Sequence, residues 1–168
     1  LGLKKVTTKY ALILNPDTTL HPSALENFLK TTKKIPKFAI MGPHTQQEKN
    51  KNDKSYLKNH SPIEVINVKG FAMFLNLSEF KDVGFFDENF FMYFEEIDLC
   101  KRLVEHGKKI YLVPDIKINH EGAASTAESI KKEIELSRNW HWMWSTFYYH
   151  KKHKGFFISF LTILPKLS

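Results

Sequence analysis

Residues 70–126 read GFAMFLNLSEFKDVGFFDENFFMYFEEIDLCKRLVEHGKKIYLVPDIKINHEGAAST. The apolar run at 71–77 predicts a strand, because short continuous apolar runs between turn residues are typical of buried strands. Apolar residues recur at helical spacing over 94–106 and stop at Gly107, which predicts a helix. Two further strands are predicted, at 109–113 and 116–119. This alternation of strands with a helix predicts an α/β domain.

The same pattern extends toward the N-terminus. Residues 10–14 form an apolar run that predicts a strand buried on both faces, ended by Asn15-Pro16-Asp17. A helix is predicted after Pro22 and another strand at 38–41. Residues 44–61 are polar, and a polar stretch of this length predicts a long loop that is either functional or disordered.

The C-terminal part of the chain has a different character. A long helix rich in Trp and Tyr is predicted at 128–150, followed by a basic cluster at 150–154 and an apolar stretch at 156–164. Such a combination is typical of a helix that lies on an anionic membrane surface. The alternative is ordinary helix packing with solvated lysines. We therefore divide the chain into a sheet domain, residues 1–127, and a helical segment, residues 128–168, that is peripheral to a membrane in the first reading.

Composition excludes several classes of protein. The chain has 168 residues, 42% of them hydrophobic, so it is able to bury a core. Its net charge of +7 comes mainly from lysine, since Arg102 and Arg138 are the two arginines, and lysine fits a polyanionic surface better than it reads nucleic acid. The single cysteine, Cys100, excludes an internal disulfide. Without a signal peptide or a run of about 20 apolar residues, we expect a cytoplasmic protein, soluble or peripheral on the inner face of the plasma membrane.

Asp17 and His120 are candidate metal ligands. Asp17 comes just after the predicted strand at 10–14, where open α/β sheets place ligands, and its carboxylate could hold a divalent cation that bridges phosphate oxygens. Alternatively, Asn15 and Asp17 form a turn and cap the helix after Pro22. His120 follows another predicted strand and either makes a structural hydrogen bond or joins Asp17 at a metal.

A second candidate site combines aromatic side chains with carboxylates. Helical spacing puts Glu96 at the edge of an apolar stripe, and it puts Glu95 on a more polar face with Asp98 and Arg102. A carboxylate at an apolar edge has its charged form disfavoured, which suits a general base. The alternative is an acidic first turn that the helix dipole stabilises. The apolar stripe comprises Ile97, Cys100, Leu103 and Val104, and the five carboxylates are Asp87, Glu88, Glu95, Glu96 and Asp98.

Three segments together resemble the inverting family 2 glycosyltransferases, in particular the rhamnosyltransferase-like and galactofuranosyltransferase-like enzymes of bacterial surface polysaccharide synthesis. The central segment combines G-F-F-D-E, an acidic pair with a further acid two residues on, then G-x-x-I, P and H in the family's order. The resemblance implies a partial GT-A fold, an α/β fold in which helices flank a mixed sheet, with a helical tail. The segments are YALILNPDTTLHPSALENF at 10–28, the central residues 70–126, and SRNWHWMWSTFYYHKKHKG at 137–155.

The resemblance also implies roles for single residues. Asp17 and His120 would hold Mg²⁺ or Mn²⁺ on the donor diphosphate. Glu95 and Glu96 would form the catalytic pair, with Glu96 as the base, although the family usually has Glu-Asp where this chain has Glu-Glu. Asp98 would orient the reacting groups or contact the acceptor. Substrate-binding roles would fall to Asn15, Gly70, Asp87 and Arg138.

The resemblance further implies which part of the enzyme the chain supplies. A nucleoside-binding βαβα unit, with which the family's domain begins, has no counterpart before residue 10. We therefore expect an acceptor-side part that binds donor weakly by itself, with an exposed sheet edge that favours self-association. The implied partners are a nucleotide-diphosphate sugar and a glycan or lipid-linked acceptor. The alternative is a non-catalytic module that binds carbohydrate or a membrane surface.

Overall fold

The computed structural model describes residues 2–43, 60–120 and 131–164. The chain divides into two compact units: the first comprises Leu1–Phe85 and Cys100–Gly122, and the second comprises Phe86–Leu99 and Ala123–Ser168. The second unit therefore takes in residues 86–99 in addition to the C-terminal helices. Most of the predicted loop at 44–61, and the predicted boundary at 127, lie outside the described residues.

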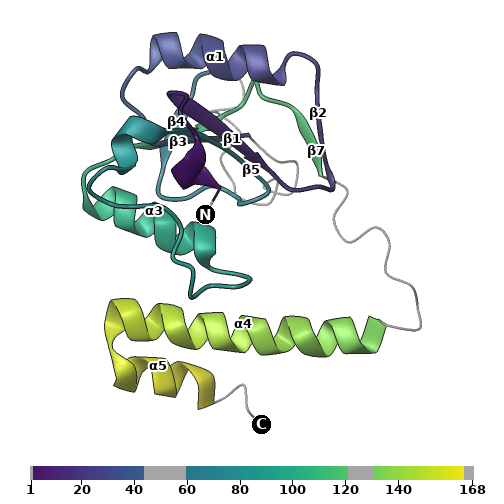
Figure 1. Ribbon diagram of the computed structural model, residues 1–168, viewed down its shortest axis with the longest axis vertical. Helices are drawn as coiled ribbons and strands as arrows, with labels where there is room; N and C mark the ends of the chain where they lie inside the picture. The colour runs from purple at the N-terminus through teal and green to yellow at the C-terminus, as the bar shows by residue number, and fades with distance from the viewer. Residues whose placement is uncertain (1, 44–59, 121–130, 165–168) are drawn as a thin grey trace. The chain divides into compact units, whose positions relative to one another are not determined.

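The first unit contains a five-stranded mixed sheet, in the order β1-β5-β3-β6-β4. β3 and β6 are parallel, and the other three neighbouring pairs are antiparallel. Helix α1 lies on one face of the sheet, and the C-terminal part of α3 lies on the opposite face (Figure 1). The predicted mixed sheet flanked by helices is thus confirmed. The elements are β1 (Tyr10–Leu14), α1 (Ala24–Lys34), β3 (Ile40–Pro43), β4 (Ile63–Val65), β5 (Ala72–Asn76), α3 (Glu95–Glu105) and β6 (Ile110–Val113), with short 3-10 helices η1 (Leu3–Lys5) and η3 (Leu77–Phe80).

β1 differs from the prediction of a strand buried on both faces. All five of its residues are half-buried, whereas all five residues of β5 are buried. The reason is position, because β1 has β5 as its single neighbour and forms one edge of the described sheet. A second, two-stranded antiparallel sheet pairs β2 (Thr18–Leu20) with β7 (Ile118–His120). β2 was not predicted.

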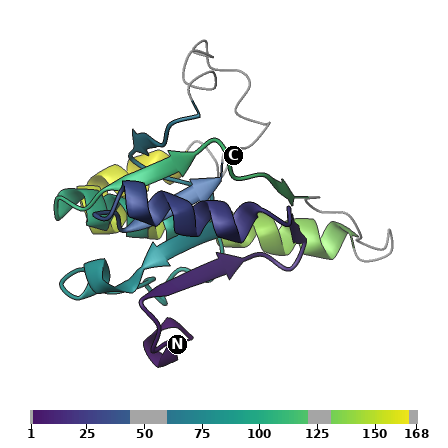
Figure 2. The same ribbon diagram turned by 90° about the horizontal axis from the view of Figure 1, so that it is seen from above.

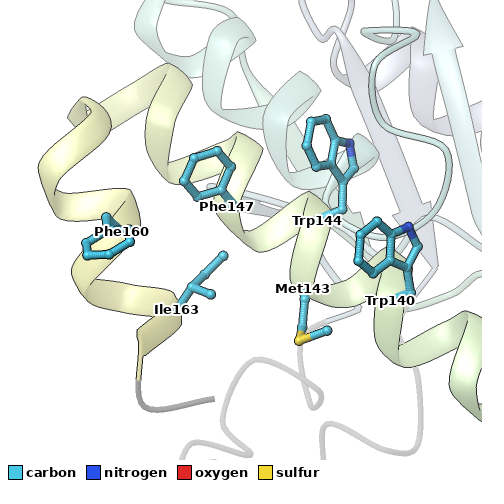
Figure 3. Close-up of a pocket in the computed structure, with 6 residues that line it drawn as sticks. All are labelled: Trp140, Met143, Trp144, Phe147, Phe160 and Ile163. Atoms are coloured by element: carbon cyan, nitrogen blue, oxygen red, sulfur yellow. The ribbon is translucent and has the colours of Figure 1, made fainter. Parts of the chain in front are cut away.

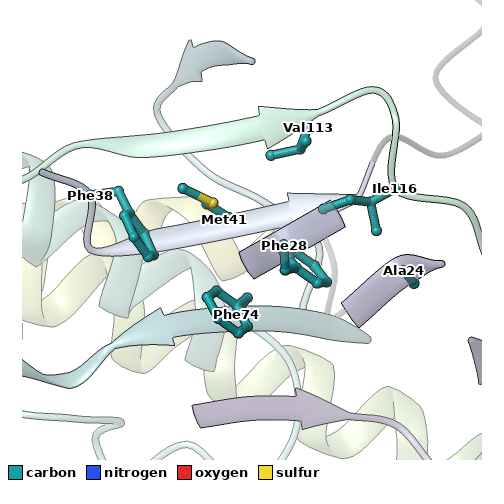
Figure 4. Packing of buried hydrophobic residues seen from close by; sticks show 7 residues of the cluster. All are labelled: Ala24, Phe28, Phe38, Met41, Phe74, Val113 and Ile116. Atoms are coloured by element: carbon teal, nitrogen blue, oxygen red, sulfur yellow. The ribbon is translucent and has the colours of Figure 1, made fainter. Parts of the chain in front are cut away.

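Aromatic stacking fixes α1 to the sheet. Phe28 of α1 stacks on Phe74 of β5 with ring centroids 4.8 Å apart, and Phe74 also stacks on Tyr10 and Phe38. Figure 2 shows α1 lying over the sheet and roughly along its strands, and Figure 4 shows the buried cluster between α1 and the sheet. Burial of a large aromatic side chain stabilises a fold by about 1.5–3 kcal/mol. The labelled cluster comprises Ala24, Phe28, Phe38, Met41, Phe74, Val113 and Ile116.

The second unit contains two antiparallel helices, α4 (Lys131–Lys154) and α5 (Phe156–Ile163). Gly155 joins them with a φ of 89°, a conformation that favours glycine. The buried hydroxyl of Ser159 donates a hydrogen bond to the backbone oxygen of Phe147 at 2.7 Å, and the ring of Phe156 packs edge-on against Phe147. Within the described part of the chain, no helix has both the length and the apolar character needed to cross a bilayer.

Replacement of Phe28 tests the importance of the aromatic stack. We expect Phe28→Ala to lower the free energy of unfolding by about 3–5 kcal/mol, because it leaves a cavity between α1 and β5. Urea denaturation followed by far-ultraviolet circular dichroism measures the change. Leu29→Ala, on the same helix at a side chain that is 44% exposed, is the matched control and should cost less than about 1 kcal/mol. Equal losses in the two variants would contradict the packing described here.

Candidate active site

Asp17 lies in a tight turn between β1 and β2. The backbone NH of Thr18 donates to the oxygen of Asn15 at 3.1 Å, which closes the turn over Pro16 and Asp17. Asp17 is exposed. The N-cap position of α1 is Ser23, separated from Asp17 by β2, so the alternative that Asp17 caps this helix is wrong.

The backbone brings the positions of Asp17 and His120 together. Thr18 is the register partner of His120 in the β2–β7 pair, and Asp17 immediately precedes Thr18. The side-chain oxygen of Thr18 is buried and has no hydrogen-bond partner among the described residues. Two positions far apart in the sequence therefore meet at one end of this small sheet, beside an unsatisfied oxygen.

The chemistry of these positions fits a divalent cation on a nucleotide. A carboxylate and an imidazole are oxygen and nitrogen donors, and Mg²⁺ usually takes only one or two protein ligands and completes its shell with phosphate oxygens and waters. Among the described side chains, no group of three His, Cys, Asp or Glu gathers into a complete protein-built metal site. The metal role of Asp17 and His120 stays a prediction.

Two of the predicted substrate-binding positions lie close to this turn. The backbone NH of Asn15 donates to the oxygen of Phe71 at 2.9 Å, and Phe71 directly follows Gly70. Asn15, Asp17, Gly70 and His120 all belong to the first unit. The first unit thus contains both predicted metal ligands and two of the four predicted substrate-binding residues.

The acidic pair belongs to the second unit and follows two strained residues. Tyr93 and Phe94 have φ values of 66° and 67°, which are unusual for residues other than glycine, and α3 begins directly after them at Glu95. Such conformations cost about 1–3 kcal/mol each and cluster at functional sites. One carboxylate oxygen of Glu95, Oε2, is buried and unpaired among the described residues. The segment therefore combines a strained backbone with an unsatisfied buried acceptor.

The buried face of α3 differs from the predicted stripe. Leu99, Cys100 and Leu103 are fully buried, but Val104 is 39% exposed, so its assignment to the stripe is wrong. The face that looked polar is packed as well: Asp98 is 0% exposed, and Arg102 donates to the backbone oxygens of Val83 and Phe85 at 2.8 and 2.6 Å. Hydrogen-bonding partners that are distant in the sequence make the burial of these charged groups tolerable, and helical spacing does not reveal such partners.

Asp98 is held by the last turn of α4. Its Oδ1 accepts a hydrogen bond from Lys152 Nζ at 2.8 Å and lies 2.8 Å from His153 Nε2. Because the carboxylate is fully buried, these partners compensate a charge that would otherwise cost several kcal/mol. Since Asp98 is fully buried, it offers no surface to an acceptor, and its orienting role stays a prediction. It also corrects the reading of the basic cluster as merely solvated, since Lys152 and His153 are internal partners.

Asp87 lies in the same network. Its Oδ2 accepts from Lys152 at 2.7 Å and from the Tyr148 hydroxyl at 3.0 Å, and its Oδ1 accepts from the backbone and side-chain nitrogens of Asn89. Burial acts to raise the pKa of Asp87, but the hydrogen bonds from Lys152, Asn89 and Tyr148 outweigh it and hold that pKa far below the usual value. Burial likewise acts to lower the pKa of Lys152, while Asp87 and Asp98 raise it overall.

Arg138, the fourth predicted substrate-binding residue, lies on α4 and is exposed. Its Nε donates to the Tyr93 hydroxyl at 3.0 Å, and this hydrogen bond is the main reason that the pKa of Arg138 is raised. The second unit thus contains Asp87, Glu95, Glu96, Asp98 and Arg138. The supporting partners Tyr148, Lys152 and His153 were missed. The available signal was the spacing of Tyr148 and Lys152, which are one helical turn apart on α4 and both face Asp87.

Sequence comparison relates the chain to bacterial rhamnosyltransferases. It is 32% identical over 118 residues to an N-acetylglucosaminyl-diphospho-decaprenol L-rhamnosyltransferase of Mycobacterium tuberculosis, a match over 68% of this chain and 37% of that protein. It is 35% identical over 80 residues to the rhamnosyltransferase WbbL of Escherichia coli K12, over 48% of this chain and 28% of that protein. The matched regions thus span 37% of the mycobacterial protein and 28% of the Escherichia coli protein. No family model matches it.

Structural comparison relates the fold to a glycosyltransferase. The crystal structure of GalNAc-T7 with UDP, GalNAc and Mn²⁺ matches 92% of this chain and 38% of that one, with a TM-score of 0.55 and 12% sequence identity. The class of fold is therefore that of part of a GT-A glycosyltransferase, as the sequence predicts. Within that class, the sequence is related to rhamnosyltransferases of the family 2 type, which confirms the resemblance inferred from residues 10–155.

The low pKa of Asp87 predicts a stability that depends on pH. A carboxylate whose pKa is lower in the folded state stabilises the fold above its ordinary pKa of 3.8, and this contribution is lost as the pH falls below that value. We expect Asp87→Asn to cost about 1–3 kcal/mol at pH 7 and progressively less toward pH 2. All three tryptophans lie on α4, so urea unfolding followed by tryptophan fluorescence reports on the second unit.

The matched control is Asp82→Asn, at an exposed turn residue of the first unit. Asp82→Asn should change the unfolding midpoint little at either pH. A loss in Asp87→Asn that stays the same from pH 7 to pH 2 would contradict the ionic role of Asp87.

Proposed function

We propose that the chain is part of an inverting glycosyltransferase that transfers a sugar from a nucleotide-diphosphate sugar to a glycan or lipid-linked acceptor. Its relatives support rhamnose as the sugar and a diphospho-lipid-linked N-acetylglucosamine as the acceptor, because these appear in the name of the mycobacterial protein. The observation that carries the proposal is the β2–β7 register, in which Thr18 pairs with His120 and follows Asp17. A module that only binds carbohydrate needs no such pair of donor groups.

In this proposal the acidic pair provides the base. As the acceptor hydroxyl oxygen forms its bond to the anomeric carbon, the bond from that carbon to the donor diphosphate breaks and the hydroxyl proton passes to Glu96. Attack opposite the leaving group inverts the anomeric centre. Glu95, with its buried unpaired oxygen, supports the idea that this turn is built to receive a ligand hydroxyl.

A divalent cation held by Asp17 and His120 would stabilise the negative charge that gathers on the leaving diphosphate. GalNAc-T7 was crystallised with Mn²⁺, which supports the choice of Mn²⁺ or Mg²⁺. The exposure of Asp17 supports its access to a diphosphate.

The Glu96→Gln variant tests the base. We expect it to lower the rate of sugar transfer by about 10²–10⁴-fold, because glutamine cannot accept the proton. The assay follows transfer of rhamnose from dTDP-rhamnose to an N-acetylglucosaminyl-diphospho-lipid in the presence of Mn²⁺, and the variant is compared with the unmodified chain and with Glu133→Gln. Glu133 lies on α4, is exposed and has no proposed role, so its variant should keep the unmodified rate within about twofold. An unchanged rate in Glu96→Gln removes this residue from the base role.

We also propose that the α4–α5 hairpin contacts an anionic membrane surface. Helix α5 exposes Phe157 by 83% and Leu161 by 65%, with further exposed apolar residues beside them. Lys151 and Lys154 are exposed just before α5. Figure 3 shows an all-apolar groove between α4 and α5 with a volume of about 240 Å³. Anionic membrane surfaces bind helices that expose aromatic residues beside lysines. The groove is lined by Trp140, Met143, Trp144, Phe147, Phe160 and Ile163.

Vesicle sedimentation tests this contact. We expect the chain to bind vesicles of phosphatidylcholine with phosphatidylglycerol more tightly than vesicles of phosphatidylcholine alone. Phe157→Glu should weaken vesicle binding about tenfold or more, because the variant loses the Phe ring that would be buried in the membrane and introduces a charge there. Ile66→Glu, at a residue that is 74% exposed in the first unit, is the control and should bind normally. Unchanged binding of Phe157→Glu, or a dimer that forms through α5 without lipid, contradicts the proposal.

A further inference from the structure

A second pocket of the same unit is polar and lies on a different face of α4. It has a volume of about 400 Å³ and is lined by one residue before α3 and four residues of α4. The four α4 residues are spaced i, i+3, i+4 and i+7, so they form one stripe along the helix. The lining residues are Tyr93, Glu135, Arg138, Asn139 and Trp142.

The pocket combines one aromatic surface with three kinds of hydrogen-bonding group. The indole of Trp142 is 38% exposed, and Asn139 provides an amide that both donates and accepts. Arg138 is held against the Tyr93 hydroxyl at 3.0 Å, which fixes the direction of its remaining donors. An apolar ring beside a few fixed polar groups is the usual composition of a small-molecule site.

The charges in the pocket decide between a neutral and an anionic ligand. The positive charge of Arg138 is accompanied by the carboxylate of Glu135, which interacts with it electrostatically. A diphosphate would be attracted by Arg138 but repelled by Glu135. A neutral sugar can use both, because its hydroxyls accept from the guanidinium and donate to the carboxylate while its ring lies on the indole. The pocket therefore favours a sugar ring over a phosphate.

The position of the pocket along the chain connects it to the proposed reaction. Tyr93 comes three residues before Glu96, and consecutive Cα atoms are about 3.8 Å apart, so the two Cα atoms lie at most about 11 Å apart. A sugar ring and the two side chains span such a distance. The strained backbone at Tyr93 and Phe94 belongs to the short segment that carries both the pocket wall and the acidic pair.

We infer that Tyr93, Arg138, Asn139 and Trp142, with Glu135, form the subsite that binds the neutral sugar ring of the acceptor and presents its hydroxyl to the acidic pair. This inference rests on the proposed glycosyltransferase function and assigns the acceptor side of that site. Trp142 and Asn139 are specificity-determining residues in it, and they do not take part in proton transfer.

Kinetics of Trp142 variants in the full chain test the inference. We expect Trp142→Ala to raise the acceptor KM about tenfold or more and to change the donor KM less than about twofold, because only the acceptor ring lies on the indole. Trp142→Phe should recover part of the acceptor affinity, since a smaller aromatic face remains. Leu136→Ala, at an exposed residue of α4 outside the pocket, is the matched control and should change neither KM. Equal changes in the donor and acceptor KM of Trp142→Ala would overturn the assignment.

A binding measurement keeps the inference separate from the proposed activity. Saturation-transfer difference NMR with methyl N-acetylglucosaminide should show contact with the chain, and the contact should be lost in Trp142→Ala and in Asn139→Ala but kept in Leu136→Ala. Inorganic pyrophosphate should not displace the sugar. If sugar transfer is absent but this contact is found, the proposed function fails and the sugar subsite stands. If pyrophosphate displaces the sugar, or the sugar does not bind, the inference fails regardless of activity.

Discussion

The carboxylate of Asp98 is completely buried, and its charge has to be balanced where it lies. Lys152 and His153, in the last turn of α4, contact this carboxylate, and Lys152 also forms an ion pair with Asp87. Further along α4, Ser145 donates to the backbone oxygen of Met92 at 2.6 Å, and Arg138 donates to Tyr93. The segment that carries the acidic pair is therefore tied to α4 at several levels. In the proposed function this support would hold the acidic pair in place, because a loosely held catalytic carboxylate loses much of its effect.

In the first unit, backbone pairing between strands holds the candidate residues in position, whereas in the second unit side-chain hydrogen bonds do so. β2 is only three residues long, and its pairing with β7 puts the turn that contains Asp17 beside the end of β7. The turn itself is tied to Phe71 by the backbone of Asn15. Because main-chain hydrogen bonds keep the register, positions 17 and 120 stay together when the strand side chains vary.

The sequence predicts a structural feature when the feature depends on neighbouring residues, and it fails when the feature depends on residues far apart in the chain. The apolar runs at 10–14, 71–77 and 109–113 and the helical stripe after Phe94 are local signals, and the corresponding elements form. The edge position of β1 was missed because it depends on which strands pair with it. The burial of Asp98 was missed because its partners lie 55 residues away in sequence. The neighbourhood of positions 17 and 120 was one of two alternatives that the residue types left open, and the family resemblance favoured it. Spacing cannot reveal a strand pairing over such a separation.

The two pockets of the second unit use two stripes of one helix. Glu135, Arg138, Asn139 and Trp142 face the polar pocket, whereas Trp140, Met143, Trp144 and Phe147 line the apolar groove, with the same i, i+3, i+4, i+7 spacing. The stripes are offset by five residues, which corresponds to about 140° around an α-helix. Because both stripes lie on α4, each stripe is regular but the two together leave no single apolar face. This double use of one helix explains the low overall amphipathicity of α4.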